Sequence, residues 1–205
     1  MIPPAIPLRP YQLDAIQKII ATYRAGERQQ CLVMATGLGK TVVFSELVRR
    51  VDGEALILVH RDELVDQTVD KLKMLGVDPE HIGIVKAQRN EVSAPCVIAS
   101  VQTVQNINRL RDILETGNRR MVVCDEAHHV LHPDTNRKSK KDRGGNNWYK
   151  IVQECADMWH DALILGCTAT PFRPNNEGII GPAPDRKSTR LNSSHSQQSR
   201  MPSSA

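Results

Sequence analysis

The chain has 205 residues, which is enough for one α/β domain with a buried core but short for two domains of ordinary size. Hydrophobic residues make up 40% of it and charged residues 24%, the balance of an ordinary globular protein. Charged residues interrupt every apolar run before the roughly 20 residues that a membrane-spanning helix needs, so we expect no membrane partner. The net charge of +4 does not by itself indicate a nucleic-acid partner, because most of it lies in residues 185–205.

Five cysteines stand singly, and several lie within apolar runs. The sequence has no C-x-x-C pair, so buried, reduced thiols are the expected state. The first residues lack the positive patch and apolar stretch of a secretory signal. Together these features predict a cytoplasmic location.

Short apolar runs alternate with longer amphipathic segments along the chain. The expected strands are Gln30–Ala35, Ala55–Val59, Ile82–Lys86, Cys96–Ser100, Met121–Cys124 and Ala162–Gly166. The expected helices are Tyr11–Ala25, Lys40–Val51, Asp62–Leu75, Val101–Glu115 and Trp148–Met158. The alternation predicts an α/β fold with a mostly parallel sheet and helices on both faces, which binds ligands at the carboxyl ends of its strands.

A glycine-containing loop, Met34–Thr41, lies between an expected strand and an expected helix. Its two glycines let successive backbone N–H groups converge on phosphate oxygens at the positive end of the helix. Lys40 would reach the β- and γ-phosphates of ATP, and the Thr41 hydroxyl would bind Mg²⁺. The usual phosphate-loop pattern begins with glycine where this chain has Met34, so the loop alone is only moderately specific. The loop residues predicted to contact the nucleotide are Thr36, Gly37, Leu38, Gly39, Lys40 and Thr41.

Two adjacent acids, Asp125 and Glu126, end an apolar strand, which is a costly place for them without a cation. Asp125 would hold Mg²⁺, and Glu126 would orient the water that attacks the phosphate. The i, i+4 spacing of His128 and His132 raises a zinc alternative. The order His-Glu-x-x-His and a cysteine cluster are both absent, so magnesium is the better interpretation.

The phosphate loop together with Asp125-Glu126-Ala127-His128 resembles the DEAH-box branch of superfamily 2 helicases and translocases. Restriction-enzyme-type and DNA-repair-type members are the most similar, through the second histidine and the run Thr-Ala-Thr-Pro-Phe-Arg at 168–173. The resemblance covers residues 8–174, with the motifs in the family's order. It implies a RecA-like P-loop NTPase domain, the first of two motor domains. ATP hydrolysis with Mg²⁺ would drive movement along nucleic acid, with DNA favoured over RNA.

The same resemblance implies roles for the flanking motifs. Arg9 and Gln12 fall in an element that recognises adenine, and a bidentate amide-to-adenine pair is chemically reasonable. Three residues, Arg61, Gln102 and Thr103, fall in motifs that contact the nucleic-acid backbone. The candidates for coupling the ATP state to strand movement are His128, Thr168 and Thr170.

Two segments carry predictions of another kind. The polar, basic stretch His132–Asn147 is either a solvated insertion or a contact to a phosphate backbone. After Pro184 the composition becomes rich in Ser, Gln and Arg without an apolar period. Asp185–His195 also matches the in-frame translation of a sequencing-library adapter. We therefore expect residues 1–184 to form the ATP-binding domain and 185–205 to be an adapter-derived, disordered tail.

We expect the second motor domain, which supplies arginines to the transferring phosphoryl group, to lie outside this chain. Such an arginine is worth roughly 10³–10⁵ in rate, so the chain alone should bind nucleotide weakly and hydrolyse it slowly. Two alternatives to a plain helicase remain open. The chain could be the motor portion of a restriction or nuclease subunit, or a nucleotide-binding module without turnover.

Overall fold

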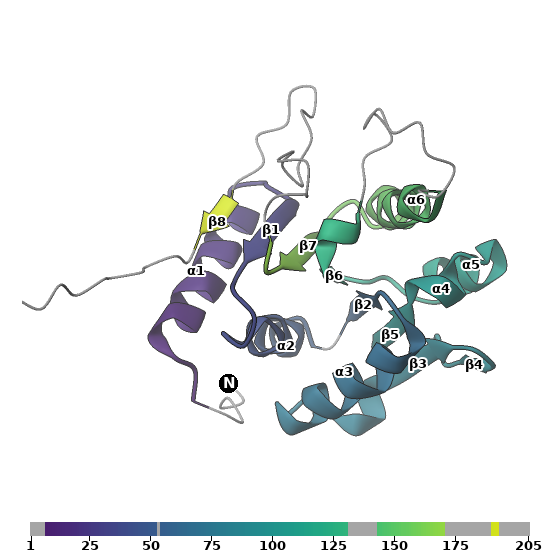
Figure 1. Cartoon of the computed structure of the whole chain (residues 1–205), viewed down its shortest axis with the longest axis horizontal. Coiled ribbons are helices and arrows are strands. Elements are labelled where there is room, and N and C mark those ends of the chain that lie inside the picture. Colours follow the sequence, from purple (N-terminus) through teal and green to yellow (C-terminus); the bar gives the residue numbers. More distant parts are fainter. Residues whose placement is uncertain (1–6, 53, 131–142, 171–189, 193–205) are drawn as a thin grey trace, which may run out of the picture.

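The computed structural model describes residues 7–52, 54–130, 143–170 and 190–192, and within them the chain forms one sheet flanked by helices (Figure 1). The strands are β1 (Gln29–Val33), β2 (Ala55–Val59), β3 (Ile82–Lys86), β4 (Arg89–Asn90), β5 (Cys96–Ser100), β6 (Met121–Asp125), β7 (Leu163–Thr168) and β8 (Arg190–Asn192). The α-helices are α1 (Pro10–Arg24), α2 (Lys40–Arg50), α3 (Asp62–Met74), α4 (Val101–Val104), α5 (Ile107–Thr116) and α6 (Arg143–Met158). Two 3₁₀ turns complete the described part, η1 (Pro79–His81) and η2 (Ala127–His129).

The sheet has the strand order β4-β3-β5-β2-β6-β7-β1-β8, and its pairs are parallel except for β3 with β4. Parallel strands need crossover connections, and most of the crossovers here contain a helix. The central strands β2 and β5 are buried along their whole length, as expected for a parallel sheet covered on both faces. The α/β fold with a mostly parallel sheet is therefore confirmed.

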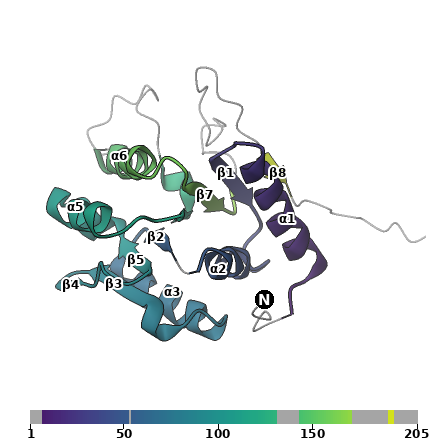
Figure 2. The same ribbon diagram turned by 180° about the vertical axis from the view of Figure 1, so that it is seen from behind.

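Two apolar clusters cover the two faces of this sheet. Side chains of α1, α2 and α3 pack on one face, with Phe44 and Ile16 among the largest buried members. Side chains of α4, α5 and α6 pack on the other, around Trp148 and Ile113. The two views of the ribbon show the helices divided between the faces in this way (Figures 1 and 2). Because both faces are packed, the carboxyl ends of the strands are the edge where polar side chains can gather.

The predicted strands at 55–59, 82–86 and 96–100 match the observed bounds. The predicted helix Val101–Glu115 is instead two helices, because the Asn106 side chain accepts a hydrogen bond from the backbone N–H of Asn108 and begins a new helix there. Strand β6 includes Asp125, and β7 continues to Thr168.

Two segments differ from expectation near the undescribed residues. Helix α6 begins at Arg143, so the end of the stretch predicted as a basic loop is helical, while 131–142 lie outside the described residues. Residues Arg190–Asn192 of the segment expected to be disordered form β8, which pairs in parallel with β1 and is the last strand of the sheet on that side. The backbone groups of β1 that do not pair with β7 are open to an extended segment, which accounts for this pairing. The other residues of 185–205 lie outside the described part.

All five cysteines are buried. Burial raises the pKa of the Cys96 and Cys124 thiols to about 12, so they stay protonated and unreactive near neutral pH. Within the described ranges, no helix has both the length and the apolar character needed to span a bilayer.

Candidate nucleotide-binding site

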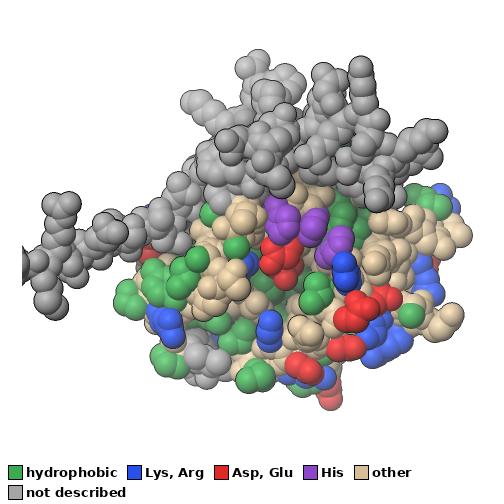
Figure 3. All heavy atoms as spheres, in the orientation of Figure 1, with side chains coloured by type: hydrophobic (Ala, Val, Ile, Leu, Met, Phe, Trp, Pro, Cys, Tyr) green, Lys and Arg blue, Asp and Glu red, His purple; other side chains and the backbone are tan. Residues whose placement is uncertain are grey.

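The candidate site lies at the carboxyl ends of β1, β6 and β7, which are neighbours in the sheet. The register pairs Val33 with Thr168 and Asp125 with Cys167, so the residues that follow these strands emerge side by side. The backbone N–H of Met34 donates to the Thr168 carbonyl at 3.0 Å and extends this alignment into the phosphate loop. Acidic and histidine side chains gather on this part of the surface (Figure 3).

The phosphate loop has the backbone shape that its glycines allow. Gly37 and Gly39 have φ values of +82° and +88°, a region that residues with a Cβ rarely adopt. Gly39 is the N-cap of α2, so the helix begins directly at Lys40 and directs its N-terminal N–H groups toward the loop. The Lys40 ammonium donates to the Met34 carbonyl at 3.4 Å, which places it across the mouth of the loop.

Helix α1 contacts the phosphate loop through two hydrogen bonds to one loop carbonyl. The Tyr11 hydroxyl and the Gln12 amide both donate to the Leu38 carbonyl, at 3.1 and 3.0 Å. The Gln12 carbonyl oxygen accepts from the backbone N–H of Arg9 at 3.0 Å, and the residue is buried. Both ends of the amide predicted to read adenine are therefore used inside the protein, while Arg9 is exposed and its guanidinium contacts the Tyr11 hydroxyl at 3.2 Å.

The two adjacent acids, Asp125 and Glu126, lie where burial and their mutual repulsion disfavour two negative charges. Burial raises the pKa of Asp125, and the neighbouring Glu126 charge raises it further. The backbone N–H of Glu126 and the charge of Lys40 act in the opposite direction. A half-buried carboxylate with a second one beside it and a lysine nearby fits Mg²⁺, which takes few protein ligands and completes its shell with phosphate and water. Among the residues described here, no group of three His, Cys, Asp or Glu side chains could hold a metal ion by itself.

A chain of contacts leads from the second acid to β7. Glu126 has φ +53°, a left-handed conformation that costs a non-glycine residue about 1 kcal/mol or more. Its carboxylate lies 3.2 Å from Nδ1 of His128, and the same nitrogen lies 3.2 Å from the Thr168 hydroxyl. The Thr168 hydroxyl accepts from the backbone N–H of Thr170 at 3.1 Å. The predicted residues of both motifs are thus brought into one hydrogen-bonded set.

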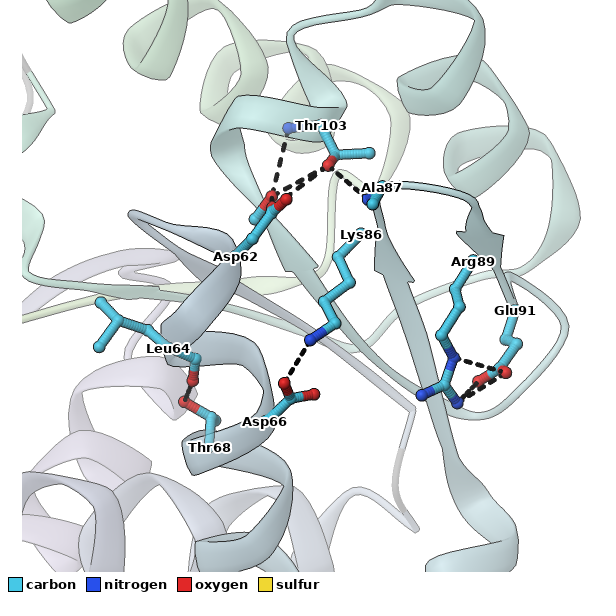
Figure 4. A network of polar contacts seen from close by, with 10 residues as sticks. Asp62, Leu64, Asp66, Thr68, Lys86, Ala87, Arg89, Glu91 and Thr103 are labelled. Carbon is cyan, nitrogen blue, oxygen red and sulfur yellow. Dashed lines mark hydrogen bonds and ion pairs between the residues drawn. The ribbon is translucent and has the colours of Figure 1, made fainter.

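A second polar cluster lies at the ends of β2, β3 and β5 (Figure 4). The Asp62 carboxylate accepts a short hydrogen bond from Ser100, and the Thr103 hydroxyl lies 3.4 Å from the same carboxylate. The backbone N–H of Ala87 donates to the Thr103 hydroxyl at 3.2 Å, so this hydroxyl is held within the fold. The predicted nucleic-acid residues Arg61 and Gln102 are exposed.

Sequence reasoning missed several supporting side chains. The contacts of Asp62 with Ser100 and Thr103, across 38 and 41 positions, have no local signal in the sequence. The pairing of Tyr11 with the Leu38 carbonyl, across 27 positions, has no local signal. The aromatic stack that joins His60, His129 and Trp148 likewise depends on the packed fold.

A phosphate loop after β1, an acidic pair after β6 and a hydroxyl run after β7, on a parallel sheet, define a RecA-like N-terminal motor domain of superfamily 2. The chain belongs to the family described as "Type III restriction enzyme, res subunit", whose model matches residues 5–173.

Two curated relatives come from yeasts. The chain is 37% identical over 135 residues to the "Putative ATP-dependent helicase IRC3" of Saccharomyces cerevisiae, covering 60% of this chain and 19% of that protein. It is 28% identical over 186 residues to the "Putative mitochondrial ATP-dependent helicase irc3" of Schizosaccharomyces pombe, covering 85% and 28%. The chain therefore spans less than a third of either relative.

Solved structures share the fold. A nuclease-deletion mutant of the Type ISP restriction-modification enzyme LlaGI, in complex with a DNA substrate mimic, matches with a TM-score of 0.62 at 16% identity, over 91% of this chain and 20% of that chain. The UvsW helicase of bacteriophage T4 matches with a TM-score of 0.61 at 18% identity, over 85% and 56%.

Proposed function

We propose that the chain is the ATP-binding half of a helicase or translocase that couples ATP hydrolysis to movement along nucleic acid, with DNA as the substrate. The observation that carries the proposal is the contact chain from Glu126 through His128 to Thr168. It joins the carboxylate that would orient the attacking water to the hydroxyl run after β7. Such a connection would let a change at the nucleotide site reach the segment after β7.

The phosphate loop and Lys40 would bind the β- and γ-phosphates, because the N–H groups at the start of α2 and the lysine charge converge on one place. Thr41 and Asp125 would hold Mg²⁺, which when bound neutralises charge on the phosphates. Glu126 would accept a hydrogen bond from water and polarise it. His128 would keep that carboxylate in place through its Nδ1–H.

The nucleic-acid side of the proposal depends on Arg61. It is exposed at the N-cap of α3, so its side chain and the N–H groups of the first helical turn are both open to a phosphate. Such contacts do not distinguish DNA from RNA. Support for DNA comes from the family description and from the structural neighbour solved with a DNA substrate mimic.

A second candidate function is the motor of a restriction or nuclease assembly, in which translocation delivers DNA to a nuclease on other chain segments. The family description favours it. Both functions assign the same roles to the residues of this domain. They differ only in whether a nuclease acts on the DNA that the motor moves.

Replacement of Glu126 by Gln tests the proposed turnover, because the amide keeps the size of the carboxylate but cannot polarise water as well. We expect Mg-nucleotide affinity to stay within about threefold, while slow hydrolysis in a single-turnover assay falls about 100-fold or more. Lys40→Ala serves as the contrasting variant and should lose binding itself. Nucleotide binding by both proteins, with hydrolysis no faster than in the absence of protein, would leave a binding module without turnover as the better description.

A further inference from the structure

Three histidine rings lie in contact in one row between two loops of the motor domain, one pair stacked and the other tilted; this row, with Trp148, is called the stack below. The rings of His60 and His129 lie 4.2 Å apart at 16°, and those of His129 and His128 lie 4.2 Å apart at 42°. Trp148 of α6 closes the other end, 6.3 Å from the His60 ring and nearly parallel to it at 13°. Figure 3 shows the histidine side chains next to one another beside the acidic group. The stack therefore joins the residue after β2 to the turn after β6.

Each end of this stack meets a segment with a role in the proposed function. His60 directly precedes Arg61, the residue proposed to contact a nucleic-acid phosphate. His128 contacts both Glu126 and Thr168. We propose that His60 and His129 are positioning residues that couple nucleic-acid contact at Arg61 to the placement of Glu126. This inference rests on the proposed function.

The strained backbone at Glu126 makes the position of its carboxylate dependent on neighbouring side chains. The residue is held at φ +53° before a three-residue 3₁₀ turn, so it needs support from outside its own segment. That support comes from His128, whose ring rests on His129 and, through it, on His60. Close-packed rings leave little free space between them, so a displacement of one is passed to the next. A shift of the His60 segment on phosphate binding would therefore move or fix the Glu126 carboxylate.

The charge state of the rings suits a packed stack. Burial lowers the pKa of His60, and it lowers the pKa of His129 to about 4, with the neighbouring His128 and Arg61 acting in the same direction. Both rings are therefore neutral near pH 7 and pack against each other without repulsion.

The hydrogen bonding of His60 shows which property of its ring is used. Its Nδ1 is buried and has no hydrogen-bond partner among the described residues. A histidine retained for a hydrogen bond through that atom would have one. The ring face is the part in contact, so phenylalanine should replace His60 in the stack and alanine should not.

The test measures binding of two ligands to the 205-residue chain. A fluorescent Mg-nucleotide analogue and a single-stranded oligodeoxynucleotide are titrated separately and then together, and the ratio of nucleotide affinities with and without oligonucleotide gives the coupling factor. In the unmodified chain we expect a factor clearly different from one. His60→Ala and His129→Ala should bring it toward one by roughly three- to tenfold, the range for loss of a stacked pair. His60→Phe should retain the coupling, and His160→Ala, an exposed histidine outside the stack, should change nothing.

Coupling that is unchanged in both alanine variants would overturn the proposal. So would a factor of one in the unmodified chain when each ligand binds alone, a result that leaves the proposed function intact. Failure of the unmodified chain to bind either ligand would overturn both, and the separate titrations reveal it. If an alanine variant unfolds, His60→Leu keeps the volume without the ring and should show the same loss.

A spectroscopic readout follows the stack directly. The chain has two tryptophans, so in a Trp159→Phe background the emission comes from Trp148, which lies against His60. Added oligonucleotide should change this emission. The change should be absent when Arg61→Ala is added to the background, and persistence of the same change there would contradict transmission from Arg61.

Discussion

Two glycines of the phosphate loop share a left-handed backbone but differ in their surroundings. A Cβ on Gly37 would meet nothing within 4 Å, whereas one on Gly39 would lie 2.5 Å from the Gln12 amide nitrogen. Gln12 could move away only by giving up its hydrogen bonds to Leu38 and Arg9. Gly37 is therefore required only by its left-handed backbone. Gly39 is required by its left-handed backbone and also by the close approach of Gln12 from α1.

We predict that Gly37→Ala lowers the free energy of unfolding by about 1 kcal/mol, the cost of the left-handed backbone alone. Gly39→Ala should lower it by about 2–3 kcal/mol, because displacement of Gln12 adds broken hydrogen bonds. Urea unfolding without nucleotide measures both. Equal losses would show that Gln12 does not hold the loop, and Gly39→Ala combined with Gln12→Ala should recover part of the difference.

A titrating histidine gives a pH dependence with a definite sign. Burial and the charges of His128, His60 and Arg61 lower the pKa of His129 to about 4, against an ordinary value of 6.5, with Glu126 opposing them. Between these values the unfolded chain binds a proton that the folded chain does not. The stability associated with His129 is therefore complete above pH 6.5 and is lost as the pH falls toward 4.

His129→Phe should keep the stack without the titration. We expect its free energy of unfolding to fall less than that of the unmodified chain between pH 7 and 4.5, by on the order of 1 kcal/mol once partial exposure is allowed for. Denaturant unfolding across this pH range provides the comparison. Parallel curves for the two proteins would mean that His129 titrates normally in the folded state.

At the scale of elements, a buried arginine fixes the segment that enters β5. Arg119 is 4% exposed, and its guanidinium donates to the carbonyls of Val92, Ala94 and Pro95 at 2.7, 2.6 and 2.5 Å. Burial lowers the pKa of Arg119, but a guanidinium stays charged and distributes its donors in a fixed fork. The start of β6 and the start of β5 are held together in this way.

Arg119→Met should fill similar space but leave three carbonyls without their donor. We expect a loss of about 2–4 kcal/mol in the free energy of unfolding. Arg119→Lys should lose less, since an ammonium can still reach some of these oxygens. The matched control is Arg111→Met, which removes an exposed 3.9 Å ion pair with Glu115 and should cost no more than about 0.5 kcal/mol. A loss below 1 kcal/mol for Arg119→Met would assign the anchoring to the surrounding apolar contacts.

The elements also show how far sequence reasoning extends. Continuous apolar runs predicted β2, β3 and β5 with their observed bounds, because a strand buried on both faces has no alternation to obscure its ends. The break at Asn106 depends on one side chain capping a backbone N–H, and the apolar periodicity continues across it.

The site divides in the same way. Motif spacing identified Glu126, His128 and Thr168, and the structure brings them together. Motif spacing could not reveal that the Gln12 amide points to the phosphate loop or that His60 stacks on His129. Such contacts join segments far apart in the sequence. They depend on the direction in which each side chain points, and hydrophobic periodicity does not indicate that direction.

At the scale of the whole molecule, the phosphate loop is open on one side. Ala35, Thr36 and Gly37 are exposed, while Lys40 and α2 approach from the domain. In the proposed site, the residues described here would therefore contact the nucleotide from one direction. In phosphoryl transfer an arginine from a facing element stabilises charge on the transferring group and contributes roughly 10³–10⁵ in rate. The chain spans 19% and 28% of its two yeast relatives, which leaves room in them for such an element.

We predict that the 205-residue chain hydrolyses ATP slowly and that fusion to the second motor domain of a family member raises kcat by about 10³-fold or more. Replacement of the phosphate-facing arginine in the fused domain by alanine should remove most of that gain while leaving Mg-nucleotide affinity within about tenfold. The steady-state rate at saturating ATP and single-stranded DNA measures both effects. A chain that already turns over as fast as the fusion would complete its transition-state site from its own residues, and the exposed side of the loop would then need a different explanation.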